Sequence, residues 1–332
     1  MNYKELRVEL FVELSMPIDT QPIAKPQLKT ETRPEEQFHT IIPQFTVNDL
    51  ILPDSTLCGI QDFLSYQKHA ELIFNGWGLS QTHSHQRQIA INLYGLPGTG
   101  KTMAAHAISH ALDKPIIAVN YSEIESKYVG ETSKNLTKLF EFARDKKAII
   151  FFDEADAMLS RRVSNMSNST DVSVNQTRSV LLTLMNNHEG LIIFTTNFIE
   201  NYDSAFMRRI LSHILFELPS LDNRQKLWHM YIPIRMPLSA NVTTQILAEK
   251  SEGLSGSDIS TCVLKAALSS ARENSEYVDL THFERAINEI RVSGAANKKQ
   301  NSHPNTTITT NVVNEDYVKL QIGEEKTEEL KR

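Results

Sequence analysis

Residues 95–102, Gly-Leu-Pro-Gly-Thr-Gly-Lys-Thr, constrain the fold of this chain more than any other stretch. A β-rich run at residues 89–94 precedes them, and an alanine-rich segment suited to a helix follows at residues 103–112. A G-x-x-x-x-G-K-[ST] sequence needs this strand, loop and helix context to be meaningful. Its glycines let backbone N–H groups wrap a phosphate, and the N-terminus of the helix adds positive potential. The stretch therefore predicts a nucleoside triphosphate site rather than a chance glycine-rich turn.

The loop also predicts individual roles. The Lys101 ammonium should reach the β- and γ-phosphates, and the Thr102 hydroxyl should ligate Mg²⁺. The predicted nucleotide-binding residues of the loop are Gly95, Pro97, Gly98, Thr99, Gly100, Lys101, Thr102 and Met103.

Two carboxylates follow the apolar strand expected at residues 148–152. Asp153 and Glu154 would lie at the carboxyl end of a buried strand, where sites in parallel sheets gather. We expect Asp153 to hold Mg²⁺ together with Thr102, and Glu154 to polarise the attacking water. An alternative makes both acids the cap and first turn of a helix, but their place downstream of a phosphate loop favours catalysis.

Strands and helices alternate along residues 89–216, with further strands expected at 115–120, 191–197 and 214–216. Repeated strand–helix units indicate an α/β fold with a parallel sheet covered by helices on both faces. Asn197 would end a strand and either orient the water or simply form a turn. Arg208 and Arg209 follow, as surface charge or as cations that reach a neighbouring subunit's γ-phosphate.

In this order and spacing, these motifs resemble those of an AAA ATPase of the AAA+ superfamily, over residues 45–292. The resemblance implies a five-stranded parallel P-loop sheet, then a small four-helix lid, and a homo-oligomeric ring, usually a hexamer, with ATP at each junction. It implies that Arg208 and Arg209 act in trans. The Arg-Arg pair and residues 126–131 are similar to the microtubule-severing and endosomal-sorting branch.

In that family, the segment matching Lys127, Tyr128, Val129 and Gly130 lines a central pore and grips a polypeptide. Tyr128 and Val129 offer apolar contact to extended chains of many sequences, and Gly130 lets the loop bend. A tyrosine packed in the core before a turn is the alternative. The Lys-Tyr-Val-Gly setting favours the pore.

The C-terminal half is expected to form lid helices at residues 222–231, 240–250, 257–273 and 281–292. By the resemblance, Gly256 and Ser257 let the lid approach the adenine and ribose. Residues 163–176, rich in serine and asparagine, are expected to form a loop, either a second pore loop or a surface loop. The predicted organisation is an N-terminal element and proline-rich linker (1–44), the ATPase domain (45–219), the lid (220–294) and a polar tail (295–332).

Composition excludes some classes of protein. The formal net charge of −6 disfavours nucleic acid as a partner. Cys58 and Cys262 lie far apart and are expected to be reduced core residues. No apolar run is long enough to span a bilayer and no signal peptide is evident, so we expect a cytoplasmic protein.

Together these observations predict an ATP-hydrolysing ring motor that remodels, partially unfolds or disassembles protein substrates by threading them through a central pore. The alternative is a nucleotide-gated scaffold or adaptor that assembles partners without threading, similar to the HORMA-domain remodelling ATPases that regulate prokaryotic signalling or defence complexes. A P-loop kinase is not favoured, because the second half of the chain carries no signature of an acceptor pocket. The expected cofactors are ATP and Mg²⁺, and nothing in the residues identifies the protein substrate.

Overall fold

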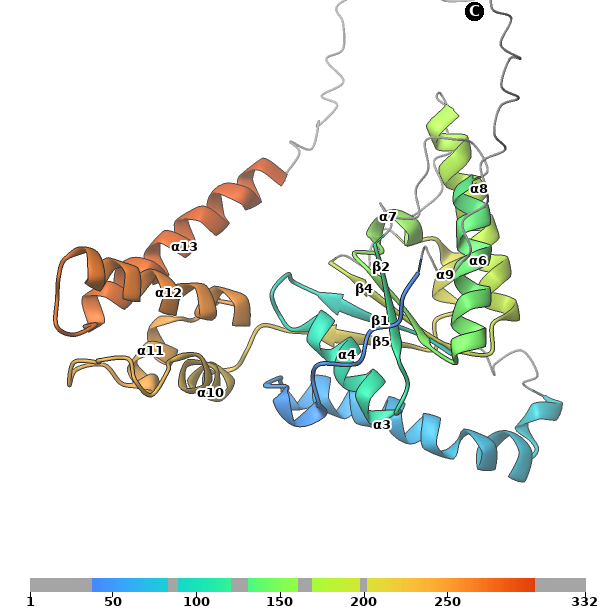
Figure 1. Ribbon diagram of the computed structural model, residues 1–332, viewed down its shortest axis with the longest axis horizontal. Coiled ribbons are helices and arrows are strands. Elements are labelled where there is room, and N and C mark those ends of the chain that lie inside the picture. Colours follow the sequence, from blue (N-terminus) through green and yellow to red (C-terminus); the bar gives the residue numbers. More distant parts are fainter. Residues whose placement is uncertain (1–37, 83–88, 121–130, 161–168, 198–201, 302–332) are drawn as a thin grey trace, which may run out of the picture. The chain divides into compact units, whose positions relative to one another are not determined.

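The computed structural model describes residues 38–82, 89–120, 131–160, 169–197 and 202–301 (Figure 1). The chain divides into two units, Met1–His39 and Thr40–Arg332. Every contact discussed below lies within the second unit. The segment at residues 127–130, predicted to line a pore, lies outside the described ranges.

A five-stranded parallel sheet carries the first half of this unit. Its strands are β1 (Ile89–Gly95), β2 (Ile116–Asn120), β3 (Ile149–Asp153), β4 (Leu191–Thr196) and β5 (Ser212–Phe216). They lie in the order β2-β3-β4-β1-β5. The apolar residues of β3 and β4 are buried, as expected for strands covered on both faces. The α/β fold predicted from the alternation of elements is confirmed.

Helices cover both faces of this sheet. On one face lie α3 (Asp54–Glu71) and α4 (Lys101–Ala111), and on the other lie α6 (Glu131–Lys146) and α8 (Ser169–Asn187) (Figure 1). The strand order explains this division. The connection from β1 to β2 runs across the sheet in the opposite direction to the connections from β2 to β3 and from β3 to β4, and right-handed crossovers then place the helices on opposite faces.

Short helices complete the α/β region. They are η1 (Val47–Asp49), η2 (Leu72–Gly76), η3 (Leu79–Gln81), α7 (Asp156–Leu159) and α9 (Ser204–Met207). Two of them matter for the site, because α7 directly follows the Asp153-Glu154 pair and α9 directly precedes Arg208.

A second hydrophobic core forms the helical lid. Its helices are α10 (Leu221–Tyr231), α11 (Thr244–Lys250), α12 (Gly256–Arg272) and α13 (Leu280–Asn301). Trp228 is fully buried at the centre, where its indole N–H donates to Ser251 Oγ at 2.9 Å and its ring meets Phe283 edge-on at 5.7 Å. Ser255 caps α12 and forms a capping box with Asp258.

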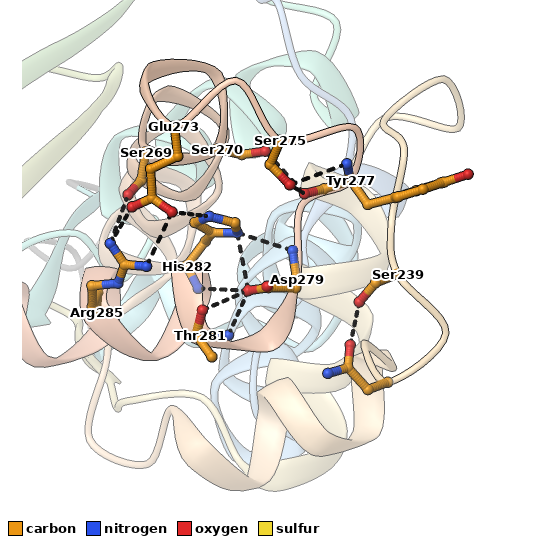
Figure 2. Close-up of polar contacts among 11 residues, drawn as sticks. Ser239, Ser269, Ser270, Glu273, Ser275, Tyr277, Asp279, Thr281, His282 and Arg285 are labelled. Carbon is orange, nitrogen blue, oxygen red and sulfur yellow. Dashed lines mark hydrogen bonds and ion pairs between the residues drawn. The ribbon is translucent and has the colours of Figure 1, made fainter.

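A polar network joins α12 to α13 within the lid (Figure 2). The buried His282 ring lies between two carboxyl-bearing residues. Its Nε2 is 3.1 Å from Glu273 Oε2, and its Nδ1 accepts the Asp279 backbone N–H at 3.0 Å. Arg285 donates to the same Glu273 carboxylate, and the Asp279 carboxylate accepts the backbone N–H of Thr281 at 2.9 Å. This network fixes the start of α13 against the end of α12.

Several local predictions are wrong. Residues 169–176, expected in a loop, belong to α8 despite the modest helix propensity of serine and asparagine, and α8 as a whole packs against α6. Helix α11 begins at Thr244 rather than residue 240, and α13 continues to Asn301, past the boundary expected at residue 294. Cys262 is buried as expected, but Cys58 is exposed. In the described ranges, no helix combines the length and apolar character needed to cross a membrane.

Candidate functional site

The glycine loop lies between β1 and α4, and its shape depends on residues without a Cβ. Gly98 has a φ of +75°, in the left-handed region that favours glycine. A Cβ built on Gly98 would lie 2.0 Å from Ser257 Oγ and 2.6 Å from Ser255 Oγ. Gly98 is therefore required both by its backbone conformation and by the close approach of the lid.

Lys101 is the first residue of α4, and its side chain is almost fully buried. Its Nζ donates to Gly95 O at 2.7 Å, Leu96 O at 2.9 Å and Asn197 Oδ1 at 3.2 Å. Burial lowers the pKa of this ammonium, while the nearby carboxylates of Asp153, Asp156 and Glu154 oppose that shift. The structure thus brings together Lys101 and Asn197, which are 96 residues apart in sequence.

Asp153 ends β3 within reach of the glycine loop. Its Oδ2 accepts the Thr102 hydroxyl at 3.3 Å, and its Oδ1 accepts the Glu154 backbone N–H at 3.1 Å and the Thr195 hydroxyl. The first of these contacts joins the two residues predicted to share a metal ion. Thr195 was not predicted from the sequence. The only signal that could have identified it as a site residue is its place near the end of β4, two residues before Asn197.

Glu154 is exposed and adopts a φ of +52°, an uncommon conformation for a residue with a side chain. Its backbone N–H also donates to Thr195 Oγ1 at 3.2 Å. Helix α7 begins only at Asp156, with Ala155 as its N-cap. The alternative in which Asp153 and Glu154 cap this helix does not describe the structure, because neither residue occupies the N-cap.

Asn197 follows β4 and is held from two sides. Its backbone N–H donates to both carboxylate oxygens of Asp156 at 3.2 Å, and its side-chain oxygen accepts from Lys101. Asp156 was not among the predicted site residues. Its contact with Asn197 was not predictable from spacing, because the two residues are brought together only by the pairing of β3 with β4.

A pocket of about 270 Å³ lies beside the glycine loop. Its wall includes residues of the loop and of α4, the lid residues Gly256 and Ser257, and apolar side chains not predicted from sequence. The residues of this last group are Leu50, Ile51, Leu52, Leu227, Met230 and Tyr231. The Ser257 N–H donates to Gly98 O at 3.2 Å, so the lid contacts the loop directly. The mainly apolar wall next to polar loop atoms suits a purine base attached to a triphosphate.

The donor set beside this pocket fits Mg²⁺. Thr102 and Asp153 supply a hydroxyl and a carboxylate within 3.3 Å of one another. Magnesium in nucleotide sites typically takes one or two protein oxygens and completes its shell with phosphates and waters. Among the residues that the structure describes, no group of three or more His, Cys, Asp or Glu side chains could hold a metal by itself.

The two adjacent arginines occupy different settings. Arg208 caps the C-terminus of α9 and is exposed. Arg209 is half-buried, and its guanidinium bonds to Asn186 and Ala205 of its own chain. The structure therefore separates two residues that had been assigned the same role.

The fold and the site define a P-loop nucleotide-binding α/β domain followed by a helical lid. Residues 91–218 match the ATPase family associated with various cellular activities (AAA), and residues 241–285 match the AAA+ lid domain. The chain is 31% identical over 309 residues to the 26S proteasome regulatory subunit 8 homolog of Schizosaccharomyces pombe, covering 85% of this chain and 74% of that protein. The chain belongs to the AAA family and is an ATPase.

Two further relatives are proteasomal. The proteasome-activating nucleotidase of Methanosarcina mazei is 32% identical over 218 residues, which cover 64% of this chain and 51% of that protein. The 26S proteasome regulatory subunit 8 homolog of Saccharomyces cerevisiae is 34% identical over 233 residues, covering 67% and 55%. The chain thus spans about half the length of these two relatives.

The predicted branch within the family is corrected by these relatives. They are proteasomal ATPases, whereas the Arg-Arg pair and the pore-loop sequence had indicated the microtubule-severing and endosomal-sorting branch. Short motifs of this kind are predicted to serve ATP hydrolysis and substrate contact. They do not discriminate between branches of the family that share these activities.

Proposed function

We propose that the protein is a ring-forming motor of the proteasomal type, which hydrolyses ATP at its subunit junctions and unfolds protein substrates by threading them through a central pore. The observation that carries this proposal is the contact of the lid with the phosphate loop. Ser257 of the lid is hydrogen-bonded to Gly98 of the loop at 3.2 Å, and both residues line the pocket. A nucleotide bound there would therefore contact both the sheet domain and the lid. A pocket shared in this way lets binding and hydrolysis change the orientation of the lid.

Different residues of the chain carry out different parts of ATP hydrolysis. Lys101 neutralises phosphate charge, and its contact with Asn197 places that amide beside the reacting phosphate. Glu154 accepts the proton of the attacking water, and the bonds from its backbone N–H to Asp153 and Thr195 fix its unusual conformation. Thr102 and Asp153 would hold Mg²⁺, which would supply charge neutralisation to the phosphates.

Ring assembly completes this site. Arg208 is exposed on the turn after α9, so its guanidinium is available to a nucleotide held by a neighbouring copy. A cation supplied in trans typically accelerates phosphoryl transfer about 10³–10⁵-fold. Hydrolysis then depends on assembly, and we propose a hexamer on the strength of the family.

The pore segment carries the mechanical part of the proposal. Tyr128 and Val129, flanked by Lys127 and Gly130, would contact an extended polypeptide in many sequence contexts, as a threading motor requires. Replacing Tyr128 should therefore separate hydrolysis from unfolding.

The test uses a folded fluorescent reporter with an unstructured extension. We expect Tyr128→Ala to retain ATP hydrolysis and lose ATP-dependent unfolding, and Glu154→Gln to bind ATP, hydrolyse poorly and retain the reporter. Tyr277→Ala removes an exposed lid tyrosine and should leave both activities unchanged. Full unfolding activity in Tyr128→Ala would contradict threading and favour a scaffold, whereas fast hydrolysis in Glu154→Gln would overturn the assignment of the base.

A further inference from the structure

Arg208 and Arg209 are neighbours in sequence, but only one of them has a free guanidinium. Within the described part of the chain, the guanidinium of Arg208 makes no hydrogen bond or ion pair, and the residue is exposed. Arg209 donates from Nε to Asn186 Oδ1 at 2.7 Å and from a terminal nitrogen to Ala205 O at 2.8 Å. A guanidinium has its donors in a rigid fork, so two bonds to two groups fix its plane.

The bonds of Arg209 join two elements. Asn186 lies in the last turn of α8, which covers the sheet, and Ala205 lies in α9, which is only four residues long. A helix this short has little stability of its own and takes its position from tertiary contacts. Arg209 therefore ties α9 to the end of a much longer helix.

Backbone bonds fix the same segment at both ends. The Asp203 N–H donates to Leu159 O at 2.9 Å, and the Leu211 N–H donates to Ala90 O at 2.8 Å. Between these anchor points, the Arg209 side chain supplies one hydrogen bond that connects the segment to α8. The turn that carries Arg208 is therefore fixed by hydrogen bonds to three other parts of the chain.

In the ring proposed above, Arg208 is the cation supplied to the neighbouring subunit, and we propose that Arg209 is a positioning residue that holds the Arg208 turn in place by bonding to Asn186. To reach a neighbouring phosphate itself, Arg209 would have to give up both of its bonds, including the bond to Asn186 of α8. This inference rests on the ring proposed above, and it divides between two residues a role that the sequence motif assigns to both.

Asn186 gives the decisive variant, because the two hypotheses predict different effects for it. If Arg209 positions Arg208, Asn186→Ala lowers kcat about fivefold, the value of one modest hydrogen bond, with KM for ATP unchanged. If Arg209 is itself catalytic, releasing it leaves kcat unchanged or raises it. Asn187→Ala is the matched control, since Asn187 is the adjacent exposed asparagine at the end of α8 and its side chain makes no hydrogen bond to the described residues.

The full experiment measures kcat, KM and sedimentation for Arg208→Ala, Arg209→Ala, Asn186→Ala and the double variant Asn186→Ala/Arg209→Ala. We expect Arg208→Ala to lose about a thousandfold or more in kcat. We expect the double variant to match Arg209→Ala, because one interaction cannot be lost twice. Additive losses in the double variant, or wild-type kcat in Asn186→Ala, would overturn the proposal.

An experiment with mixed rings tests the proposed function separately from this inference. Glu154→Gln subunits retain both arginines, so adding them to Arg208→Ala subunits should restore part of the hydrolysis at junctions where they supply the missing cation. No restoration would refute action in trans and with it the ring mechanism. If hydrolysis is restored and Asn186→Ala has the wild-type kcat, the ring mechanism stands and only the positioning role of Arg209 is refuted.

Discussion

A buried histidine makes the stability of the sheet domain sensitive to mild acid. His188 lies between α8 and β4 and is 6% exposed, with its ring edge-on to Phe140 at 5.1 Å. Its Nε2 has no hydrogen-bond partner among the described residues. Burial lowers the pKa of this imidazole from 6.5 to about 4, and the charges of Arg144 and Lys114 add to the shift.

The sign of the effect follows from where the proton binds. Between pH 6.5 and about pH 4, the unfolded chain protonates this histidine while the folded protein does not. The unfolded state then binds more protons, so the free energy of unfolding falls as the pH falls. Using the two pKa values, the loss at pH 5 is about 2 kcal/mol relative to neutral pH, and it approaches about 3 kcal/mol below pH 4.

The assay is equilibrium urea unfolding of the wild type and His188→Phe at neutral pH and at pH 5. We expect the wild type to lose about 2 kcal/mol more than the variant between these conditions. Any packing cost of the phenylalanine cancels in this difference, as do the contributions of other titrating groups. His229→Phe, at an exposed lid histidine, should behave as the wild type does. Equal losses in the wild type and His188→Phe would refute the reasoning.

Two further predictions concern the lid. Gly98→Ala places a Cβ against Ser257 and requires a left-handed backbone, which costs about 1–2 kcal/mol, so ATP binding measured by calorimetry should weaken at least about tenfold. Adding Ser257→Gly should recover only the steric part, and wild-type affinity in Gly98→Ala would contradict the contact. In the lid network, hydrogen bonds from Arg285 and then His282 lower the pKa of Glu273 from 4.5 to about 2 (Figure 2). The stability due to this pairing is present above pH 4.5 and is lost as the pH falls toward 2, so the thermal midpoint of Arg285→Ala should lie below that of the wild type at neutral pH and converge with it in acid. A constant difference across that range would show that Glu273 is not the partner responsible.

The parts of the site that were predictable from sequence are those formed by short runs of neighbouring residues. The glycine loop, the Asp153-Glu154 pair and Asn197 each follow a short apolar strand, and parallel strands bring their carboxyl ends to one edge. The order of motifs therefore predicted that Lys101, Asp153 and Asn197 would meet. Thr195 escaped notice, because a threonine inside an apolar strand has no pattern that distinguishes it from a packing residue.

The parts that were not predictable depend on residues distant in sequence. Arg209 differs from Arg208 because Asn186, 23 residues earlier, lies within 2.7 Å of its Nε, and no spacing rule encodes that contact. The first two turns of α8 escaped prediction for a similar reason. Their serines, threonine and asparagine have low helix propensity, and it is α8 as a whole that packs against α6.

In the ring proposed above, helix α7 connects the chain's own nucleotide site to the segment that carries Arg208. At its start, Ala155 N donates to Thr195 O at 2.9 Å and the Asp156 carboxylate accepts from Asn197 N. At its end, Leu159 O accepts from Asp203 N at 2.9 Å, at the head of the segment that carries Arg208. The helix is one turn long and bonded at both ends, so a shift of Glu154 or Asn197 must either break one of these bonds or move the arginine segment. Because packed interiors transmit small displacements rather than absorb them, the second outcome is favoured. Changes at one pocket of the ring would then alter how well the next pocket is completed.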